Sequence, residues 1–401
     1  MKIGIVTTWF ERGAAIVSRQ FMDVLNSQNH DIYIYARGGE HFAKNDKNWN
    51  LKNVTWNKYL FSNIPTDIDK TQFLEWIKNT NLDCIIFNEQ QFLAPVAWAK
   101  DLQVPCIAYI DYYTKDNINS FNIYDQLWCN TKRHFSAFSW HEGARYVPWG
   151  TDISIFNYKG IEAKYQFFHS SGMSPYRKGT DIFINAMYEI KDTLKEKKLK
   201  SLIHTQVPIK KVFPNLKDKI EELEGIEILD IIQKTIPQPG LYHLGKIYIY
   251  PSRLEGIGLT LAEAACSGLY IVTSSNEPMA EFAMSNFSDL IDIDNYFSRK
   301  DNYYWDMCEP SIRSLKEIML KNIKIDAYQI SQEAAKRFNF KANAISLSEH
   351  LNEISFRAID SSDRALIFKN DSGIGIFFKS RNKLTRIIFG ALKKIKDMFY
   401  G

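Results

Sequence analysis

Short runs of apolar residues alternate along the chain with longer segments in which apolar residues recur every three or four positions. The short runs predict buried strands, and the helical spacing predicts amphipathic helices. The first 150 residues contain six predicted strands, at 2–8, 31–36, 83–88, 104–110, 126–130 and 144–148. The first helix is predicted over 14–26, with Ile16, Phe21, Met22 and Leu25 on its apolar side. Strands separated by helices are typical of βαβ units, so we expect a parallel sheet.

The alternation breaks at Pro148-Trp149-Gly150-Thr151-Asp152, which we interpret as a linker, and then starts again. Six more strands are predicted, at 166–170, 201–205, 226–229, 246–250, 269–273 and 290–293. Helical patterns cover 180–198 and 259–266, and a closing helical run covers 328–338 and 342–354. The pattern therefore predicts an α/β protein with two Rossmann-like parallel-sheet domains, at 1–150 and 151–355.

The remaining residues, 356–401, form a predicted C-terminal extension. Apolar runs at 365–369 and 374–378 flank Asn370-Asp371-Ser372-Gly373, which predicts a β-hairpin. A final amphipathic helix is predicted over 382–399, with lysines and arginines opposite its apolar face. Such a helix either binds an anionic membrane surface or packs on the body of the protein, and we favour the membrane.

Charge and cysteine content narrow the class of protein. The chain carries +4, but residues 379–401 contain seven basic residues and one acid, so residues 1–378 carry −2. This distribution gives no support to a nucleic-acid-binding protein. No two of the five cysteines have metal-ligand spacing, and no apolar run is long enough for a signal peptide or a membrane span. We expect a cytoplasmic protein, with peripheral contact at the inner face of the membrane through 382–399.

The most informative stretch runs from residue 248 to residue 268. A buried strand ends in a loop that contains Gly256 and Gly258, and a helix begins near Leu259. The glycines allow the backbone to approach a ligand, and the helix start offers amides suited to a diphosphate. Glu255 lies in the loop, and Glu263 lies about one turn into the helix, where it can accept hydrogen bonds from ribose hydroxyls.

With its flanking residues Pro-Ser-x-x-Glu-Gly-x-Gly-Leu and Glu-Ala-x-x-x-Gly, this stretch resembles the E-x7-E signature of retaining glycosyltransferases of the GT-B fold, in particular glycosyltransferase family 4, the group 1 type. The resemblance implies that two Rossmann-like domains face a cleft. It also implies that Glu263 holds the ribose and that Glu255 contacts the donor sugar. The diphosphate would then be held by Lys178 and by the amides around Gly258, Leu259 and Thr260.

A second stretch, 167–181, resembles the family's strand and its Gly-Arg-x4-Lys-Gly loop. Gly172 and Lys178-Gly179 match this pattern, but Met173 stands where the family has arginine. Arg177, directly before the lysine, is the candidate substitute. The departure at Met173 also keeps open a non-catalytic binding or scaffold protein that retains the GT-B fold.

Acceptor-side and metal sites are less marked. In this fold the loop after the first strand opens into the interdomain cleft, so Gly13 there and Asp111 after the strand 104–110 are acceptor-side candidates. Asp67-Ile68-Asp69 and Asp292-Ile293-Asp294 spell the Asp-x-Asp of metal-dependent GT-A enzymes. We interpret the first as a helix cap and the second as a strand end, so no metal or other cofactor is expected.

The sequence thus predicts a retaining hexosyltransferase that uses a nucleoside-diphosphate sugar, with UDP-sugars favoured from the family. The expected acceptor is a glycan or a lipid-linked sugar, as in the synthesis of surface polysaccharide or glycolipid. The alternative is the scaffold protein named above. A third interpretation is a GT-B enzyme of different chemistry, such as a phosphorylase or an epimerase. The lack of a lysine in a pyridoxal-phosphate setting argues against the phosphorylase.

Overall fold

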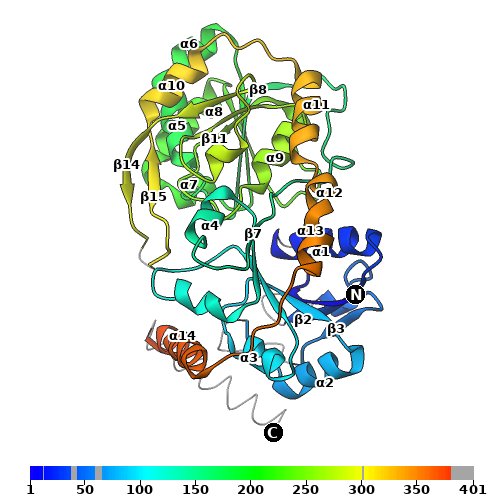
Figure 1. Cartoon of the computed structure of the whole chain (residues 1–401). Coiled ribbons are helices and arrows are strands. Elements are labelled where there is room, and N and C mark those ends of the chain that lie inside the picture. Colours follow the sequence, from blue (N-terminus) through cyan, green and yellow to red (C-terminus); the bar gives the residue numbers. More distant parts are fainter. Residues whose placement is uncertain (12, 38–42, 59–65, 300–301, 381–401) are drawn as a thin grey trace. The chain divides into compact units, whose positions relative to one another are not determined.

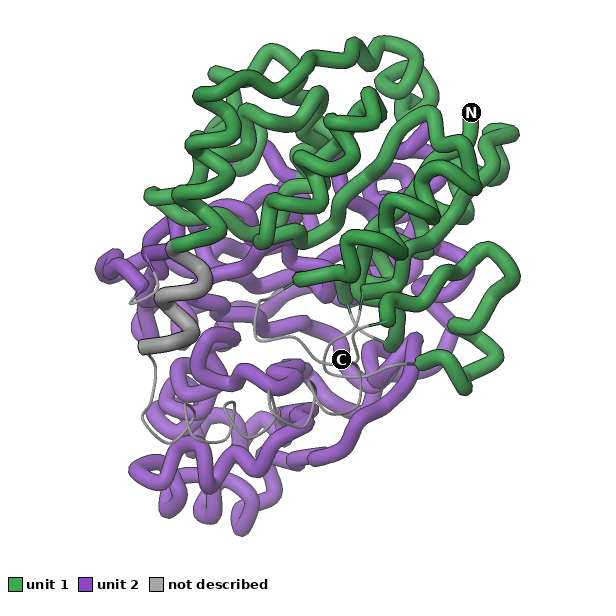
Figure 2. Tube along the Cα trace, turned by 90° about the horizontal axis from the view of Figure 1, so that it is seen from below, with its two compact units in different colours: residues 1–130, 134–147, 346–401 green, residues 131–133, 148–345 purple. Residues whose placement is uncertain are grey.

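The structure is a computed structural model that describes residues 1–11, 13–37, 43–58, 66–299 and 302–380 (Figure 1). The chain forms two compact units (Figure 2). Unit 1 contains residues 1–130 and 134–147 and the described residues from 346 onward, and unit 2 contains residues 131–133 and 148–345. Residues 346–355, which we assigned to the second domain, therefore group with unit 1 in the structure.

Unit 1 is built on a seven-stranded parallel sheet with the order β3-β2-β1-β4-β5-β6-β7. Its strands are β1 (Lys2–Thr8), β2 (Asp31–Arg37), β3 (Val54–Trp56), β4 (Cys84–Asn88), β5 (Cys106–Ile110), β6 (Gln126–Cys129) and β7 (Ala144–Tyr146). Its helical segments up to residue 137 are α1 (Gly13–Ser27), η1 (Ala43–Asn45), α2 (Lys70–Thr80), α3 (Ala94–Asp101), η2 (Ile118–Ile123) and α4 (Lys132–Ala137), whose first two residues group with unit 2. The six strands predicted for this half are all present, and β3 was missed because three residues give too short a pattern.

The central strands of unit 1 are apolar on both faces, as expected for a parallel sheet covered by helices. Every residue of β4 and β5 is buried. On one face Phe21 of α1 packs between Tyr109 of β5 and Trp128 of β6, with ring centroids 5.1 and 5.5 Å away. This burial fixes the strands, so the loops at their carboxyl ends start from rigid positions.

Unit 2 repeats the design with a six-stranded parallel sheet in the order β10-β9-β8-β11-β12-β13. Its strands are β8 (Tyr165–Gly172), β9 (Ser201–Thr205), β10 (Leu229–Gln233), β11 (Gly245–Tyr250), β12 (Tyr270–Ser274) and β13 (Ser288–Ile291). A separate antiparallel pair, β14 (Ile293–Phe297) and β15 (Met307–Pro310), follows. The order reverses direction between β8 and β11, and the carboxyl ends of strands at such a switch point are where α/β sheets bind ligands.

The helices of unit 2 connect these strands and close the unit. They are α5 (Thr180–Glu189), α6 (Lys191–Glu196), α7 (Ile209–Val212), η3 (Pro214–Leu216), α8 (Lys217–Gly225), η4 (Tyr242–Leu244), α9 (Leu259–Cys266), η5 (Met279–Phe282), α10 (Ile312–Leu320), α11 (Ala327–Phe338) and α12 (Phe340–Asn343). The helix predicted over 180–198 is divided at Ile190, and the one predicted over 342–354 is divided into α12, η6 (Ala344–Ser346) and α13 (Leu347–Asn352).

The β-hairpin predicted from the turn residues 370–373 is wrong, because these residues lie inside the helix α14 (Ser361–Ser380). In unit 1, α14 lies against η2 and α3 (Figure 1). The Asp371 carboxylate accepts the backbone amides of Leu93 and Ala94 at 2.8 and 3.0 Å. Asn370 donates to the carbonyl of Gln91 at 2.9 Å. These contacts with a distant segment outweigh the local turn preference, and the helix predicted over 382–399 lies outside the described residues.

Candidate functional site

The loop between β11 and α9 carries most of the predicted site. Gly258 has φ +94°, a left-handed conformation that few other residues adopt, and it directly precedes the first residue of α9. No side chain caps this helix start. The amides of Leu259 and Thr260 therefore lie among the unpaired donors of a helix N-terminus, as the sequence predicted.

The loop between β8 and α5 is held against the β11–α9 loop by a close backbone contact. Gly179 has φ +69°, and a Cβ atom there would lie 1.9 Å from the carbonyl oxygen of Pro251. Only glycine permits that approach. The Arg253 amide donates to the Arg177 carbonyl at 2.8 Å and joins the two loops a second time. The two loops therefore carry Arg177, Lys178 and Glu255 into one cluster.

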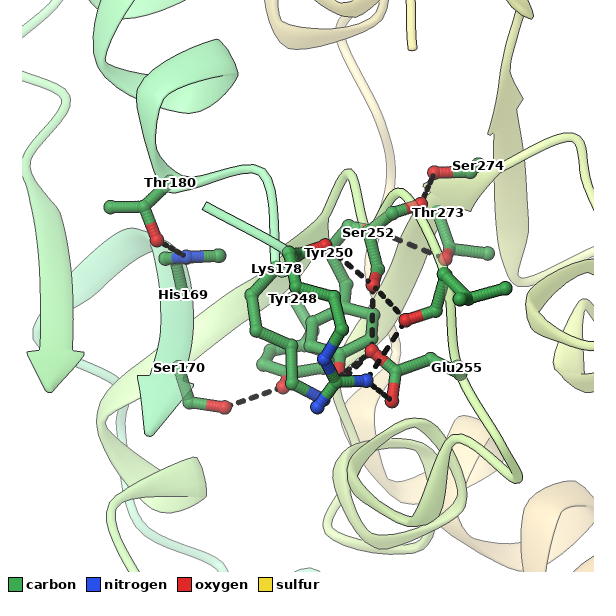
Figure 3. Close-up of polar contacts among 12 residues, drawn as sticks. His169, Ser170, Lys178, Thr180, Tyr248, Tyr250, Ser252, Glu255, Thr273 and Ser274 are labelled. Carbon is green, nitrogen blue, oxygen red and sulfur yellow. Dashed lines mark hydrogen bonds and ion pairs between the residues drawn. The ribbon is translucent and has the colours of Figure 1, made fainter. Parts of the chain in front are cut away.

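Glu255 is the centre of this cluster, with only 5% of its surface exposed (Figure 3). Lys178 Nζ lies 2.7 Å from its Oε1, and Arg177 Nη1 lies 3.0 Å from its Oε2. The hydroxyls of Ser252 and Tyr250 donate to Oε1 at 2.6 and 2.9 Å. Four donors thus fix both oxygens of a buried carboxylate.

The charges in the cluster shift one another's pKa values. Burial alone would raise the pKa of Glu255, but the charges of Arg177 and Lys178 outweigh it and lower that pKa to about 2. Burial lowers the pKa of Lys178 to about 8, although Glu255 opposes the shift. At neutral pH Glu255 is therefore ionised and Lys178 still carries most of its charge.

Glu263 lies on α9, where the sequence placed it. Burial raises the pKa of its carboxyl group, and the Tyr242 hydroxyl donates to its Oε2 at 2.6 Å. Aromatic rings lie beneath this part of the site. Tyr248 stacks on Tyr250 with centroids 5.3 Å apart, and its hydroxyl is hydrogen-bonded to Ser170 Oγ at 2.6 Å (Figure 3).

The side chain of Met173 is 75% exposed, at the position where the resemblance expects an arginine. Arg177 instead reaches Glu255 and donates to the carbonyl of Leu254 at 2.9 Å. This placement fits the prediction that Arg177 substitutes for the missing arginine, and that role stays a prediction.

The sequence reasoning missed several side chains that build the site. Tyr250 and Ser252 bond Glu255, and both precede it in the same stretch. Arg253 is almost fully buried and pairs with Asp181 at 2.8 Å and with Glu309 at 2.7 Å. It joins the start of α5 to β15, a contact between distant segments that leaves no local pattern.

In unit 1 the acceptor-side candidates lie at the carboxyl ends of parallel strands. Gly13 begins α1 after β1, and Asp111 directly follows β5. Glu89, which the sequence reasoning did not select, follows the neighbouring strand β4 with a left-handed φ of 54°. The charges of Asp111 and Glu89 both contribute to the raised pKa of Tyr109, after burial as the main cause. Two carboxylates therefore gather near Tyr109.

The first Asp-x-Asp sequence has the structural role that we predicted. Asp69 caps α2 by accepting the amide of Gln72 at 2.7 Å. All five cysteines are free and buried. Within the described ranges we find no group of three acidic, histidine or cysteine side chains arranged to hold a metal ion. Likewise, none of the described helices combines the length and the apolar character needed to span a bilayer.

Part of the chain, including the loops described above, matches a known protein family. Residues 164–290, which contain β8 to β12, match the family model of the glycosyl transferases group 1. No curated protein gives a significant match by sequence. The family match confirms, over these residues, the resemblance drawn from the Glu255–Glu263 stretch.

Solved structures resemble the whole fold at low sequence identity. The structure of Anabaena HepE in complex with UDP and glucose has a TM-score of 0.65 at 14% identity, covering 88% of this chain and 99% of that one. The structure of sucrose-phosphate synthase from Thermosynechococcus elongatus has a TM-score of 0.62 at 13% identity, covering 88% of this chain and 98% of that one. The apo form of the lipopolysaccharide outer core galactosyltransferase WaaB has a TM-score of 0.60 at 12% identity, covering 88% of this chain and 99% of that one. Together with the two parallel sheets, these matches confirm the predicted GT-B fold.

Proposed function

We propose that the chain is a retaining glycosyltransferase that moves a sugar, of hexose type, from a nucleoside-diphosphate sugar to a carbohydrate acceptor. The observation that carries the proposal is the cluster of Arg177, Lys178 and Glu255 next to the N-terminus of α9. The cluster lies inside the region that matches the group 1 glycosyltransferases. HepE has been solved with UDP and with UDP-glucose, which supports uridine as the base.

In the proposed reaction the bond between the anomeric carbon and the diphosphate breaks, and negative charge grows on the leaving diphosphate. An acceptor hydroxyl forms the new bond to the anomeric carbon, and its proton passes to the departing diphosphate. Lys178, Arg177 and the amides of Leu259 and Thr260 stabilise that charge, because cations and helix N-termini attract anions. The ionised Glu255 contacts donor-sugar hydroxyls and stabilises the positive charge that develops at the anomeric carbon. These interactions strengthen toward the transition state, where they accelerate the reaction.

The ion pairs of the cluster also suggest how donor binding would prepare Glu255. Both cations are paired with this carboxylate in the structure. A diphosphate brings further negative charge to the same two cations and so shares them with Glu255. The ion pairs to Glu255 then weaken, and its oxygens become available to the sugar.

On the acceptor side we propose a glycan or a lipid-linked sugar, in the synthesis of surface polysaccharide or glycolipid. The similarity to WaaB, a lipopolysaccharide galactosyltransferase, supports this class of acceptor. The basic amphipathic pattern of 382–399 supports a site of action at an anionic membrane. Gly13 and Asp111 are the residues we propose to face the acceptor, and we propose that no resident metal takes part.

Thermal-shift measurements with UDP, GDP, ADP and their common sugars test the donor site. We expect one nucleotide and its sugars to raise the melting temperature of the full-length chain. The shift should vanish in Glu263→Ala and persist in Glu317→Ala, which removes an exposed carboxylate on α10. No shift with any nucleotide would contradict the proposal and favour the non-catalytic scaffold protein.

A further inference from the structure

The hydroxyl group of Tyr242 holds one oxygen of Glu263. Tyr242 begins η4, directly before β11, whereas Glu263 lies on α9. The hydrogen bond between Tyr242 Oη and Glu263 Oε2 is 2.6 Å long, which is short for a neutral donor and typical of a bond to a charged carboxylate. Residues from two separate elements thus meet at the carboxylate that the proposed function assigns to the ribose.

The ring of Tyr242 has little freedom to move. It is buried, and it packs edge to face against the rings of Phe156, Phe168 and Tyr248, with centroids 5.9, 5.8 and 5.8 Å away. Three neighbouring rings restrict rotation of this side chain. The direction of its hydroxyl, and with it the orientation of the Glu263 carboxylate, is therefore set by the core of unit 2.

The bond from Tyr242 also favours the ionised form of Glu263. Burial raises the pKa of Glu263, and the bond from Tyr242 and the charge of Lys178 oppose that rise. Within the described residues, Tyr242 is the side chain that donates a hydrogen bond to this carboxylate, and it does so at Oε2. The other oxygen, Oε1, remains available to accept a hydroxyl from a ligand.

We propose that Tyr242 is a positioning residue that aims Glu263 Oε1 at one ribose hydroxyl, at the 2′ or the 3′ position, and makes the site select nucleotides that carry this hydroxyl over analogues that lack it. The proposal rests on the proposed function, in which Glu263 holds the ribose. A carboxylate held in one orientation favours a ligand that supplies the hydroxyl over one that leaves Oε1 without that hydrogen bond. A carboxylate free to rotate can turn to other donors and discriminates less.

Calorimetric titration of the full-length chain with UDP, 2′-deoxy-UDP and 3′-deoxy-UDP tests the proposal. The unmodified chain should bind UDP about tenfold more tightly than at least one deoxy analogue. In Tyr242→Phe, UDP affinity should fall by about three- to tenfold while the affinity for that analogue changes little. The matched control is Tyr165→Phe. Tyr165 is the first residue of β8, and this change removes the 2.6 Å hydrogen bond from its hydroxyl to Asp230, so the selectivity should stay unchanged.

The pH dependence gives a second readout that loss of packing alone would not change. Without the Tyr242 hydroxyl the pKa of Glu263 should rise further, because one of the two effects that oppose burial is gone. A protonated Glu263 accepts ribose hydroxyls poorly. UDP affinity should therefore begin to fall at a higher pH in Tyr242→Phe than in the unmodified chain as the solution is acidified.

The outcomes separate this inference from the function on which it rests. If Glu263→Gln loses the selectivity but folded Tyr242→Phe keeps both the selectivity and the pH profile, the role of Tyr242 is wrong and the donor site stands. If the folded chain does not bind UDP, or Glu263→Gln binds it normally, the proposed donor site fails and this inference fails with it. Circular dichroism and melting curves establish that each variant is folded.

Discussion

At the residue scale, Glu255 is a carboxylate whose charge is controlled by its neighbours. Arg177 and Lys178 bond its two oxygens from one loop, and Tyr250 and Ser252 bond it from its own stretch. A buried charge is tolerated only when it is paired in this way. The cost is that the two cations are occupied by a side chain of the protein before any diphosphate arrives.

This competition predicts opposite effects of Glu255→Gln on binding and on turnover. Removing the negative charge frees Arg177 and Lys178 for the diphosphate, so UDP affinity should increase by about threefold or more. The rate of sugar transfer should fall by at least about a hundredfold, because the variant loses the negative charge that stabilises the developing cation. Calorimetry with UDP and a transfer assay with the donor sugar check the two arms. Weaker UDP binding in the folded variant would contradict the competition.

A second residue-scale prediction concerns pH and Lys178. Burial lowers its pKa to about 8, against the opposing charge of Glu255. Above that pH the free chain loses the ammonium charge, so UDP affinity should fall by up to about tenfold between pH 7 and pH 9. Lys178→Arg keeps its charge over this range, and its affinity should stay nearly constant. Equal slopes in the two proteins would show that Lys178 does not control binding.

Glu89 carries backbone strain at the carboxyl end of β4. Its φ is 54°, and the buried Arg37 bonds the carbonyls of Asn88 and Glu89 at 2.7 and 3.1 Å. Glycine tolerates this conformation, so Glu89→Gly should raise the free energy of unfolding by about 1 kcal/mol. Glu75→Gly, at an exposed position inside α2, should lower it by about the same amount. Denaturant unfolding monitored in unit 1 gives the free energy of unfolding of both variants. A lower free energy of unfolding in Glu89→Gly would mean that the glutamate side chain makes contacts that compensate for the strain.

At the element scale, the sequence predicts what local patterns encode. The strand over Lys2–Thr8 and the helix over Leu259–Cys266 appear with the predicted bounds, because an apolar run and a glycine-bounded helix are local signals. In the site, Glu255, Lys178 and Glu263 were found from spacing and resemblance. Tyr242 and Arg253 were not, since their roles exist only once distant elements pack together.

The hairpin predicted at residues 370–373 is wrong because a contact with a distant segment outweighs a local sequence signal. Residues 370–373 have strong turn chemistry, but Asp371 supplies a cap for α3, a helix whose own start has no side-chain cap. Asp371→Ala should remove two hydrogen bonds and destabilise unit 1 by about 1–2 kcal/mol. It should also speed proteolytic cleavage within 354–372, while Lys369→Ala, which changes an exposed neighbour, should not. Unchanged cleavage would mean that the cap contributes little to docking of α14.

At the scale of the whole molecule, the chain contains two parallel sheets, to which the proposed function gives different tasks. The sheet of unit 2 presents cations, a helix N-terminus and an ionised carboxylate at its switch point, which suits a nucleotide sugar. The sheet of unit 1 presents Asp111 and Glu89 at its carboxyl edge, which suits the hydroxyls of an acceptor. If the proposed function holds, donor recognition is encoded in a compact stretch of sequence, and acceptor recognition is dispersed over several loops.

The distribution of charge predicts that the full chain binds anionic membranes. Residues 382–401 carry five basic residues and one acid, whereas residues 1–378 carry −2. Each lysine or arginine near an anionic surface contributes about 1 kcal/mol, so co-sedimentation should be strong with phosphatidylserine vesicles and weak with phosphatidylcholine. High salt should reduce it, because screening shortens the reach of these charges.

Two variants separate the membrane interpretation from a helix packed on the body of the protein. A chain that ends at residue 381 should lose vesicle binding and keep its UDP affinity. A chain with Lys393, Lys394 and Lys396 replaced by glutamine keeps the apolar positions of the segment, and it should lose most of the preference for anionic lipid. If the shortened chain binds vesicles as well as the full chain, 382–401 is not the membrane contact. If shortening instead lowers the melting temperature without changing vesicle binding, the segment stabilises the fold.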